Sequence, residues 1–266
     1  MKVFISSDIE GTTGINHWDE TRHGNPDVAY FMKQMTREVN AVCQGAIAAG
    51  AESILVKDGH ATGRNLLPEG LPEEVKLLRG WTGDPYSMMG GINTQDFDAV
   101  MFTGYHSWTN NGGNPLSHSK NTKHMGIIIN GVVASEFMIN SYTAGMLGIP
   151  VCFLSGDKAM CQYAESFIPG LKTVAVNEGI GGATISIHPD LAVRRLKETA
   201  QAALSGDYKS CRVPMPKEFE VIIRYKEHTL AYTKSFFPNA ALVNDTDVRL
   251  VTKDYFDVLR LIQFGF

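Results

Sequence analysis

Two carboxylates follow the first apolar segment of the chain at a spacing of two residues. Residues 3–5 (Val-Phe-Ile) predict a buried strand, and Asp8, Glu10 and Gly11 come soon after it. Side chains alternate along an extended backbone, so Asp8 and Glu10 can face the same side. Carboxylates this close repel each other unless a positive charge lies between them, and a divalent metal ion is the simplest such charge. The alternative is that Asp8 caps a helix and Glu10 faces solvent.

Two further apolar segments end in a glycine and a histidine. Residues 56–60 (Val-Lys-Asp-Gly-His) end at His60, and residues 103–106 (Thr-Gly-Tyr-His) end at His106. A single histidine is more often a core or surface residue than a metal ligand, so the prediction rests on the repeated pattern. Asp58 is expected either to orient an imidazole or to hold the turn.

One edge of a parallel sheet should collect these residues, because the carboxyl ends of all its strands open there. Glu136 can join them from the first turn of a predicted helix, where the helix dipole alone also favours an acid. Three carboxylates and two imidazoles exceed the ligands of one tetrahedral ion and suit two zinc ions that share a carboxylate. Imidazole and carboxylate without thiolate favour zinc over manganese or cobalt. The predicted metal ligands are Asp8, Glu10, His60, His106 and Glu136.

The segment at residues 107–117 is rich in asparagine and glycine and leads to His118. This composition predicts a mobile loop of the kind that closes over a site. His118, between Ser117 and Ser119, is a candidate base or nucleophile near the metals. The alternative is a loop histidine with no role.

The elements that must position these residues alternate between strand and helix. Apolar residues spaced by three and four predict a helix that opens near residue 28 and ends at Gly50. The alternation predicts an α/β fold, with a mainly parallel sheet covered by helices on both faces. Further predicted strands are residues 53–56, 99–102, 151–154 and 173–176, and further predicted helices are 135–148, 157–169 and 189–205.

Two segments depart from this alternation. Asn130-Gly131 lies between apolar residues 127–129 and 132–133, which predicts an antiparallel hairpin. Pro214 and Pro216 indicate a boundary between a catalytic metal-binding domain (1–213) and a small α+β lobe (214–266). We expect this lobe to serve oligomerisation or to form part of a pocket. Its predicted elements are strands at 221–223 and 248–251 and helices at 228–236 and from 254.

Composition limits the partners and the compartment. The 266 residues carry a net charge of −4, which gives no electrostatic case for nucleic acid or an anionic membrane. The apolar segments are shorter than the roughly 20 residues of a membrane span. The sequence shows no signal-peptide pattern, and its four cysteines are scattered, so we expect buried free thiols in the cytoplasm. The tryptophans Trp18, Trp81 and Trp108 are expected in the core or an interface, and the alternative is that they line a pocket.

With these motifs assembled, the chain resembles the DppA-type D-aminopeptidases, a family of dinuclear zinc peptidases. The family sequence Ser-x-Asp-x-Glu-Gly is matched at residues 6–11. The Asp-x-His phrase ending at His60, the Gly-Tyr-His phrase ending at His106, the Ser-His-Ser phrase around His118, and Glu136 also match. The resemblance is strong over residues 1–160 and weak beyond about 205.

The resemblance implies roles for these residues. Asp8 would bridge two zinc ions, Glu10 and His60 would complete one site, and His106 and Glu136 the other. His118 would be the catalytic nucleophile or general base. The implied function is a metal-dependent aminopeptidase that removes residues from the free N-terminus of short peptides, with a preference for D-amino acids. Family members assemble as ring-shaped decamers with the active sites in an inner chamber.

This chain differs from the family pattern around His118. The preceding loop is rich in asparagine and about one residue longer, and residues 120–124 carry Lys120, Lys123 and His124. Such loops shape substrate pockets, although a solvated position is expected for His124.

Two other functions compete with the aminopeptidase. One is a dinuclear hydrolase of another amide or of a phosphoester, which the same ligands permit. The other is a non-enzymatic nucleotide-binding module built on residues 177–184. That glycine-rich segment fails the dinucleotide pattern, because Thr184 stands where the last glycine belongs.

Overall fold

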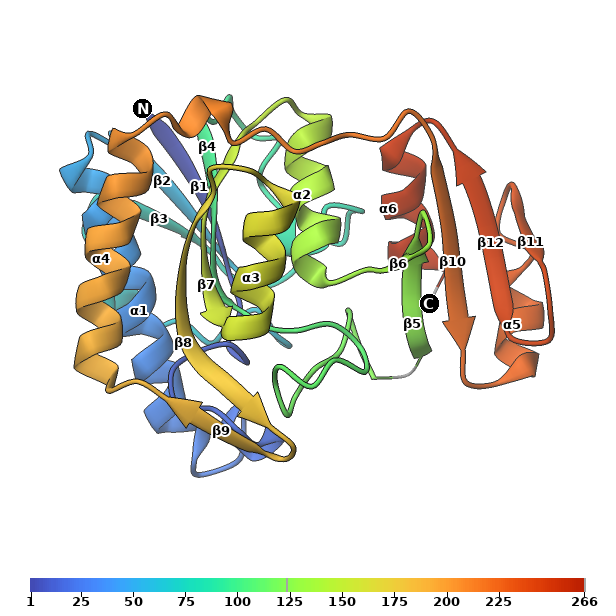
Figure 1. The fold of residues 1–266 in the computed structure, drawn as a ribbon, viewed down its shortest axis with the longest axis horizontal. Coiled ribbons are helices and arrows are strands. Elements are labelled where there is room, and N and C mark those ends of the chain that lie inside the picture. Colours follow the sequence, from blue (N-terminus) through green and yellow to red (C-terminus); the bar gives the residue numbers. More distant parts are fainter. Residues whose placement is uncertain (123, 266) are drawn as a thin grey trace.

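A seven-stranded sheet forms the larger part of the molecule in the computed structural model, which describes residues 1–122 and 124–265 (Figure 1). Its strand order is β3-β2-β1-β4-β7-β8-β9. All neighbours are parallel except β8 and β9, which form a hairpin. The strands are β1 (Lys2–Ser7), β2 (Ser53–Asp58), β3 (Val75–Leu78), β4 (Ala99–Tyr105), β7 (Val151–Asp157), β8 (Lys172–Ile180) and β9 (Ala183–Ser186).

Helices cover both faces of this sheet, as predicted. Strands β4 and β7 are buried at every residue, which requires cover on each side. Helix α1 (Val28–Ala48) packs against α4 (Pro189–Ser205) on one face. Helices α2 (Glu136–Met146) and α3 (Lys158–Phe167) lie on the other, as right-handed crossovers from β4 to β7 and from β7 to β8 require (Figure 1). No helix within the described ranges is long and apolar enough to cross a membrane.

A second, antiparallel sheet lies beside the first. Its strand order is β11-β12-β10-β5-β6, and helices α5 (His228–Lys234) and α6 (Tyr255–Phe264) accompany it. The predicted hairpin at Asn130-Gly131 is confirmed, since both residues have positive φ and join β5 to β6. The strands are β5 (His124–Ile129), β6 (Val132–Val133), β10 (Phe219–Tyr225), β11 (Ala240–Leu242) and β12 (Asp247–Thr252).

Strand β5 pairs with β10, so residues from the middle of the chain complete the sheet of the C-terminal segment (Figure 1). The domain boundary near residue 213 stays a prediction. The pairing matters for the site, because the chain passes from His118 through β5 and β6 to Glu136. The second sheet therefore helps to position both His118 and Glu136.

Glycines let the carboxyl ends of β1 and β4 approach each other. The Gly11 N–H donates to the Gly104 carbonyl at 2.8 Å. A Cβ on Gly11 would lie 2.1 Å from the Tyr105 carbonyl oxygen, and one on Gly104, whose φ is +66°, would lie 2.2 Å from the Asp8 carbonyl oxygen. A side chain at either position would separate the segments that carry Asp8 and His106.

Candidate metal centre and active-site pocket

The first group of candidate ligands lies at the carboxyl ends of β1 and β2. His60 Nδ1 is 3.3 Å from Asp8 Oδ1 and 3.0 Å from Glu10 Oε2. All three side chains are buried. His60 Nε2 lies 2.9 Å from the Thr21 carbonyl, to which it can only donate, so the neutral ring presents the Nδ1 lone pair to the two carboxylates.

The second group shares Asp8 with the first. His106 Nε2 is 3.5 Å from Asp8 Oδ2 and 3.8 Å from Glu136 Oε2. Its Nδ1 lies 2.8 Å from the Ser107 carbonyl and can only donate to it, so the neutral ring again has its lone pair on the inward nitrogen. Within each group the ligand atoms lie within 4.8 Å of one another, which is the spacing of groups that can hold one metal ion.

The donor set of these residues fits zinc. Oxygen and imidazole nitrogen are both zinc ligands, and both imidazoles are fixed through their outer nitrogens. His106 Nε2 is buried without a hydrogen-bond partner among residues 1–122 and 124–265. An unpartnered buried nitrogen costs about 1–3 kcal/mol, which coordination would recover.

Without a metal, protons supply the positive charge that these carboxylates need. Burial lowers the pKa of His106, but Glu136, Glu10 and Asp8 outweigh it and raise that pKa to about 9. His60 is affected in the same way, since Glu10 and Asp8 raise its pKa well above the usual value despite burial. Burial and the charge of Glu10 raise the pKa of Asp8, whereas the facing imidazoles overcome burial and lower that of Glu10.

His118 lies directly beside the second group. Its ring stacks on that of His106, with centroids 4.4 Å apart and planes 13° apart, and Trp18 meets it edge-on at 5.3 Å. His118 Nδ1 lies 2.9 Å from the Leu116 carbonyl, and Nε2 lies 3.7 Å from Glu136 Oε1. The neutral ring therefore carries its lone pair on Nε2, on the side of the carboxylates.

The loop that precedes His118 is anchored at several points. The Ser107 N–H and Oγ donate to the Asp157 carboxylate at 2.6 and 2.7 Å. Asn114 Nδ2 donates to the Glu10 carbonyl at 3.1 Å. The glycine-rich segment 177–184 is the end and turn of the β8–β9 hairpin, so it is not the strand-to-helix turn that a nucleotide phosphate would need.

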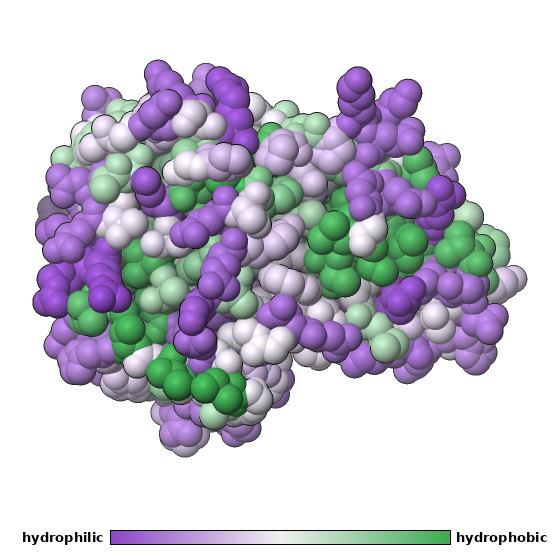
Figure 2. Space-filling view, viewed as in Figure 1, coloured by the Kyte–Doolittle hydropathy of each residue, from purple (hydrophilic) through white to green (hydrophobic). Residues whose placement is uncertain are grey.

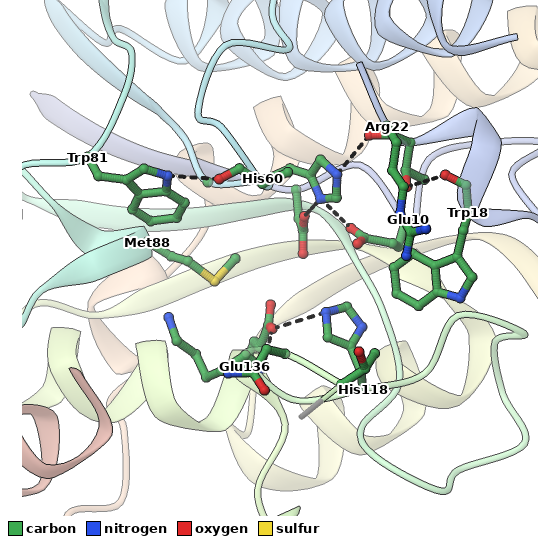
Figure 3. Close-up of a pocket in the computed structure, with 15 residues that line it drawn as sticks. Glu10, Trp18, Arg22, His60, Trp81, Met88, His118 and Glu136 are labelled. Carbon is green, nitrogen blue, oxygen red and sulfur yellow. Dashed lines mark hydrogen bonds and ion pairs between the residues drawn. The ribbon is translucent and has the colours of Figure 1, made fainter. Parts of the chain in front are cut away.

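A cavity of about 260 Å³ opens over these groups and is lined by Asp8, Glu10, His60, His118 and Glu136. Trp81 and Met88 lie on one side of the carboxylates and Trp18 on the other (Figure 3). Trp18 and Trp108 pack against the core, as predicted, and Trp18 and Trp81 also line this cavity. Trp81 reaches the pocket because its indole N–H donates to the Ala61 carbonyl at 2.8 Å.

Asp58 and His124 are two residues near the site whose surroundings the structure defines. Asp58 holds the turn, because its carboxylate accepts from the Asn65 N–H at 2.6 Å and the Leu66 N–H at 2.8 Å. The prediction that His124 is a solvated loop residue is wrong, since it begins β5 and is 3% exposed. Burial lowers the pKa of His124 to about 4, with smaller contributions from His118 and Lys226.

A chain of hydrogen bonds ties together the elements beneath the site. Asn140 Nδ2 on α2 donates to the Tyr105 hydroxyl on β4 at 2.8 Å. That hydroxyl lies 2.8 Å from Ser6 Oγ on β1, which donates to the Met88 carbonyl at 2.8 Å. Met88 belongs to the short helix η3 (Ser87–Met89). The network joins four segments that carry or flank the candidate ligands.

Comparison with known proteins identifies the family. A family model described as peptidase M55, D-aminopeptidase, matches residues 1–264. The chain belongs to the M55 family of D-aminopeptidases. The resemblance noted in the sequence is thus confirmed.

A curated sequence and a solved structure are similar to this M55 peptidase over nearly their whole length. The D-aminopeptidase of Bacillus subtilis (strain 168) is 28% identical over 256 residues, which are 96% of this chain and 92% of that protein. The structure of the zinc-dependent D-aminopeptidase DppA from Bacillus subtilis, described as a self-compartmentalizing protease, superposes with a TM-score of 0.91. That match has 27% identity and covers 100% of this chain and 96% of the other.

The structure brings all six predicted residues of the M55 peptidase together, while their roles stay predictions. Sequence reasoning missed the Thr21 carbonyl that orients His60, and the contacts of Trp81. Every residue has a backbone carbonyl, so the sequence gives no sign that the carbonyl of Thr21 is the one that orients His60.

Zinc binding by this M55 peptidase should release protons at pH 7. His106, with a pKa of about 9, and His60, with a higher pKa than usual, are both protonated without metal and must lose a proton to bind it. Apparent zinc affinity should therefore rise by up to about tenfold per pH unit for each proton released, up to about pH 9. Zinc titration calorimetry in buffers of different ionisation enthalpy measures the number released, and a value of zero would contradict the expectation.

Proposed function

We propose that this M55 peptidase removes the N-terminal residue of short peptides, with a preference for D-amino acids, at a centre of two zinc ions. The observation that carries the proposal is the pair of ligand groups that share Asp8, with His118 stacked against one of them. The family, the curated D-aminopeptidase sequence and the solved zinc-dependent structure support this activity.

In this proposal Asp8 would be the ligand shared by the two ions, Glu10 and His60 would complete one site, and His106 and Glu136 would complete the other. When bound, zinc would polarise the scissile carbonyl and lower the pKa of water to roughly 7. One of the ions or a nearby carboxylate would hold the free amino group of the peptide. His118 would accept a proton at Nε2, because its Nδ1–H is directed to the Leu116 carbonyl. The same lone pair could attack directly, as the alternative role implies.

Oligomerisation is part of the proposal. Apolar side chains are exposed over the second sheet and over the β8–β9 hairpin (Figure 2). Ile180 and Ile185 on that hairpin are 59% and 61% exposed, and Val132, Val133 and Leu242 are exposed on the second sheet. Such surfaces are typical of contacts between subunits. The DppA relative is a self-compartmentalizing protease, so we infer a ring-shaped decamer with its sites facing an inner chamber.

A cytoplasmic location completes the proposal. The four cysteines, Cys43, Cys152, Cys161 and Cys211, are buried and free, as predicted. Unpaired thiols are typical of reducing compartments.

Asp8→Ala should abolish peptide hydrolysis and reduce bound zinc, because both metal groups lose their shared ligand. Zinc content by mass spectrometry and alanine release from D-Ala-D-Ala measure the two effects. The exposed Glu73→Ala variant is the control and should keep both. Full zinc content and full turnover in Asp8→Ala would refute the bridging role. Hydrolysis of p-nitrophenyl phosphate faster than of any peptide would favour the phosphoesterase instead.

His118→Ala should reduce kcat on D-Ala-D-Ala by about 10²-fold or more while zinc content stays unchanged. The reason is that the imidazole moves protons, and general acid–base groups contribute about 10²–10⁴-fold. The exposed His228→Ala variant should keep the wild-type kcat. A near-normal kcat for His118→Ala would show that His118 has no catalytic role.

The protein should have a mass in solution of about ten times its 29.2 kDa chain. Light scattering coupled to size-exclusion chromatography measures this mass. An Ile180→Asp/Ile185→Asp double variant should form smaller species, because charges would be buried at the contact. A monomeric wild type at micromolar concentration would refute the decamer.

A further inference from the structure

Lys120 stands at the rim of the pocket in an unusual backbone conformation. Its φ is +69°, a left-handed value that residues with a side chain rarely adopt. The Lys120 N–H donates to Glu136 Oε1 at 2.6 Å, and its ammonium donates to Ser87 Oγ at 2.6 Å. Ser87 also has a positive φ, of +53°. Unfavourable conformations of this kind gather at functional sites, where the surrounding fold holds them.

The ammonium of Lys120 has capacity left for a ligand. An ammonium offers three donors, and the structure shows one hydrogen bond from Lys120 Nζ within residues 1–122 and 124–265. Lys57 is also close to the pocket, but its Nζ donates hydrogen bonds to the carbonyls of Asp58 and Gly80 at 2.5 and 2.8 Å. The same Nζ lies 4.3 Å from the centroid of the Trp81 ring. Lys120 is therefore the lysine that lines the cavity among residues 1–122 and 124–265.

The polar groups of the cavity match the two ends of a short peptide. A metal ion held by the proposed ligands would bind the substrate's amino group, and the ammonium of Lys120 provides positive charge for a carboxylate. Arg22 is exposed and lies 5.0 Å from the Trp18 ring, on the opposite side from Met88 (Figure 3). Met88 is the neighbour of Ser87, so Lys120 reaches toward the Met88 side of the cavity.

The size of the cavity favours a substrate whose carboxylate is near the scissile bond. Its volume of about 260 Å³ is below the roughly 300–1,000 Å³ of pockets for drug-sized ligands. Consecutive Cα atoms are about 3.8 Å apart, so a dipeptide has its carboxylate within one residue of the bond to be cleaved. A longer or amidated peptide has no charge at that place.

We propose that Lys120, held by Ser87, binds the free C-terminal carboxylate of a dipeptide substrate and makes the enzyme prefer dipeptides. This inference rests on the proposed peptidase function. It makes Lys120 a specificity-determining residue on the leaving-group side, separate from the metal ligands. The backbone N–H of Lys120 would orient Glu136 whatever the side chain, so recognition and metal binding can be changed independently.

The test compares D-Ala-D-Ala with its C-terminal amide, which has the same scissile bond and no carboxylate. The zinc-loaded wild type should have a kcat/KM at least about tenfold higher for the free acid, the scale of a charged hydrogen bond. Lys120→Met should bring this ratio close to one through a fall in kcat/KM for the free acid, with zinc content unchanged. Lys120→Arg should keep part of the preference, because the charge remains.

Lys226→Met is the matched control, since Lys226 Nζ donates to the Thr122 carbonyl of the same loop and its side chain is exposed. It should leave the ratio unchanged. Equal kcat/KM for the two substrates in the wild type, or an unchanged ratio in Lys120→Met, would overturn the inference. The wild-type comparison needs no substitution, so a poorly folded variant cannot obscure the result. Absence of hydrolysis of both substrates by the wild type would instead refute the proposed peptidase function.

Discussion

The electrostatic repulsion among three buried carboxylates is the constraint on which the rest of this structure depends. Asp8, Glu10 and Glu136 are each at most 5% exposed and meet at one sheet edge. Two like charges 4 Å apart repel by about 4 kcal/mol at an effective dielectric constant of 20, so cations must lie among them. Two imidazoles face the carboxylates at 3.0–3.8 Å, and carbonyls behind them fix which nitrogen points inward. Protons or metal ions can then supply the missing charge, which is what a metal-dependent enzyme requires.

The second sheet is part of the site's construction. The chain leaves the pocket after His118 and Lys120, forms β5 and β6 against β10, and returns to the pocket at Glu136. Ser135 caps the N-terminus of α2 by accepting from the Met138 N–H at 3.0 Å, which fixes the first turn that carries Glu136. The candidate ligand group that contains Glu136 and the proposed substrate contact at Lys120 therefore both depend on the pairing of β5 with β10. These two strands are far apart in the sequence.

The sequence predicted the main features of the site because they follow local rules. An apolar strand that ends in Asp-x-Glu-Gly, Gly-His or Gly-Tyr-His identifies its own carboxyl end, and a parallel sheet brings such ends together. What it did not predict depends on distant partners. Apolar alternation at 127–129 and 221–223 does not say that these strands pair, and nothing local shows that His124 is buried beneath them. The sequence left Trp81 between a pocket and the core or an interface, because its place in the pocket depends on a carbonyl twenty residues away.

The hydrogen-bond chain from Asn140 through Tyr105 and Ser6 to Met88 bears on whether the protein needs bound metal to stay folded. It joins α2, β4, β1 and η3 below the site without using any candidate ligand. Small zinc domains fold only when the ion arrives, because nothing else holds their ligands in place. Here the framework is already assembled by side chains and a closed core, so the free energy of metal binding can go into affinity. We therefore expect the chain to stay folded when zinc is scarce and to bind it again when the supply returns.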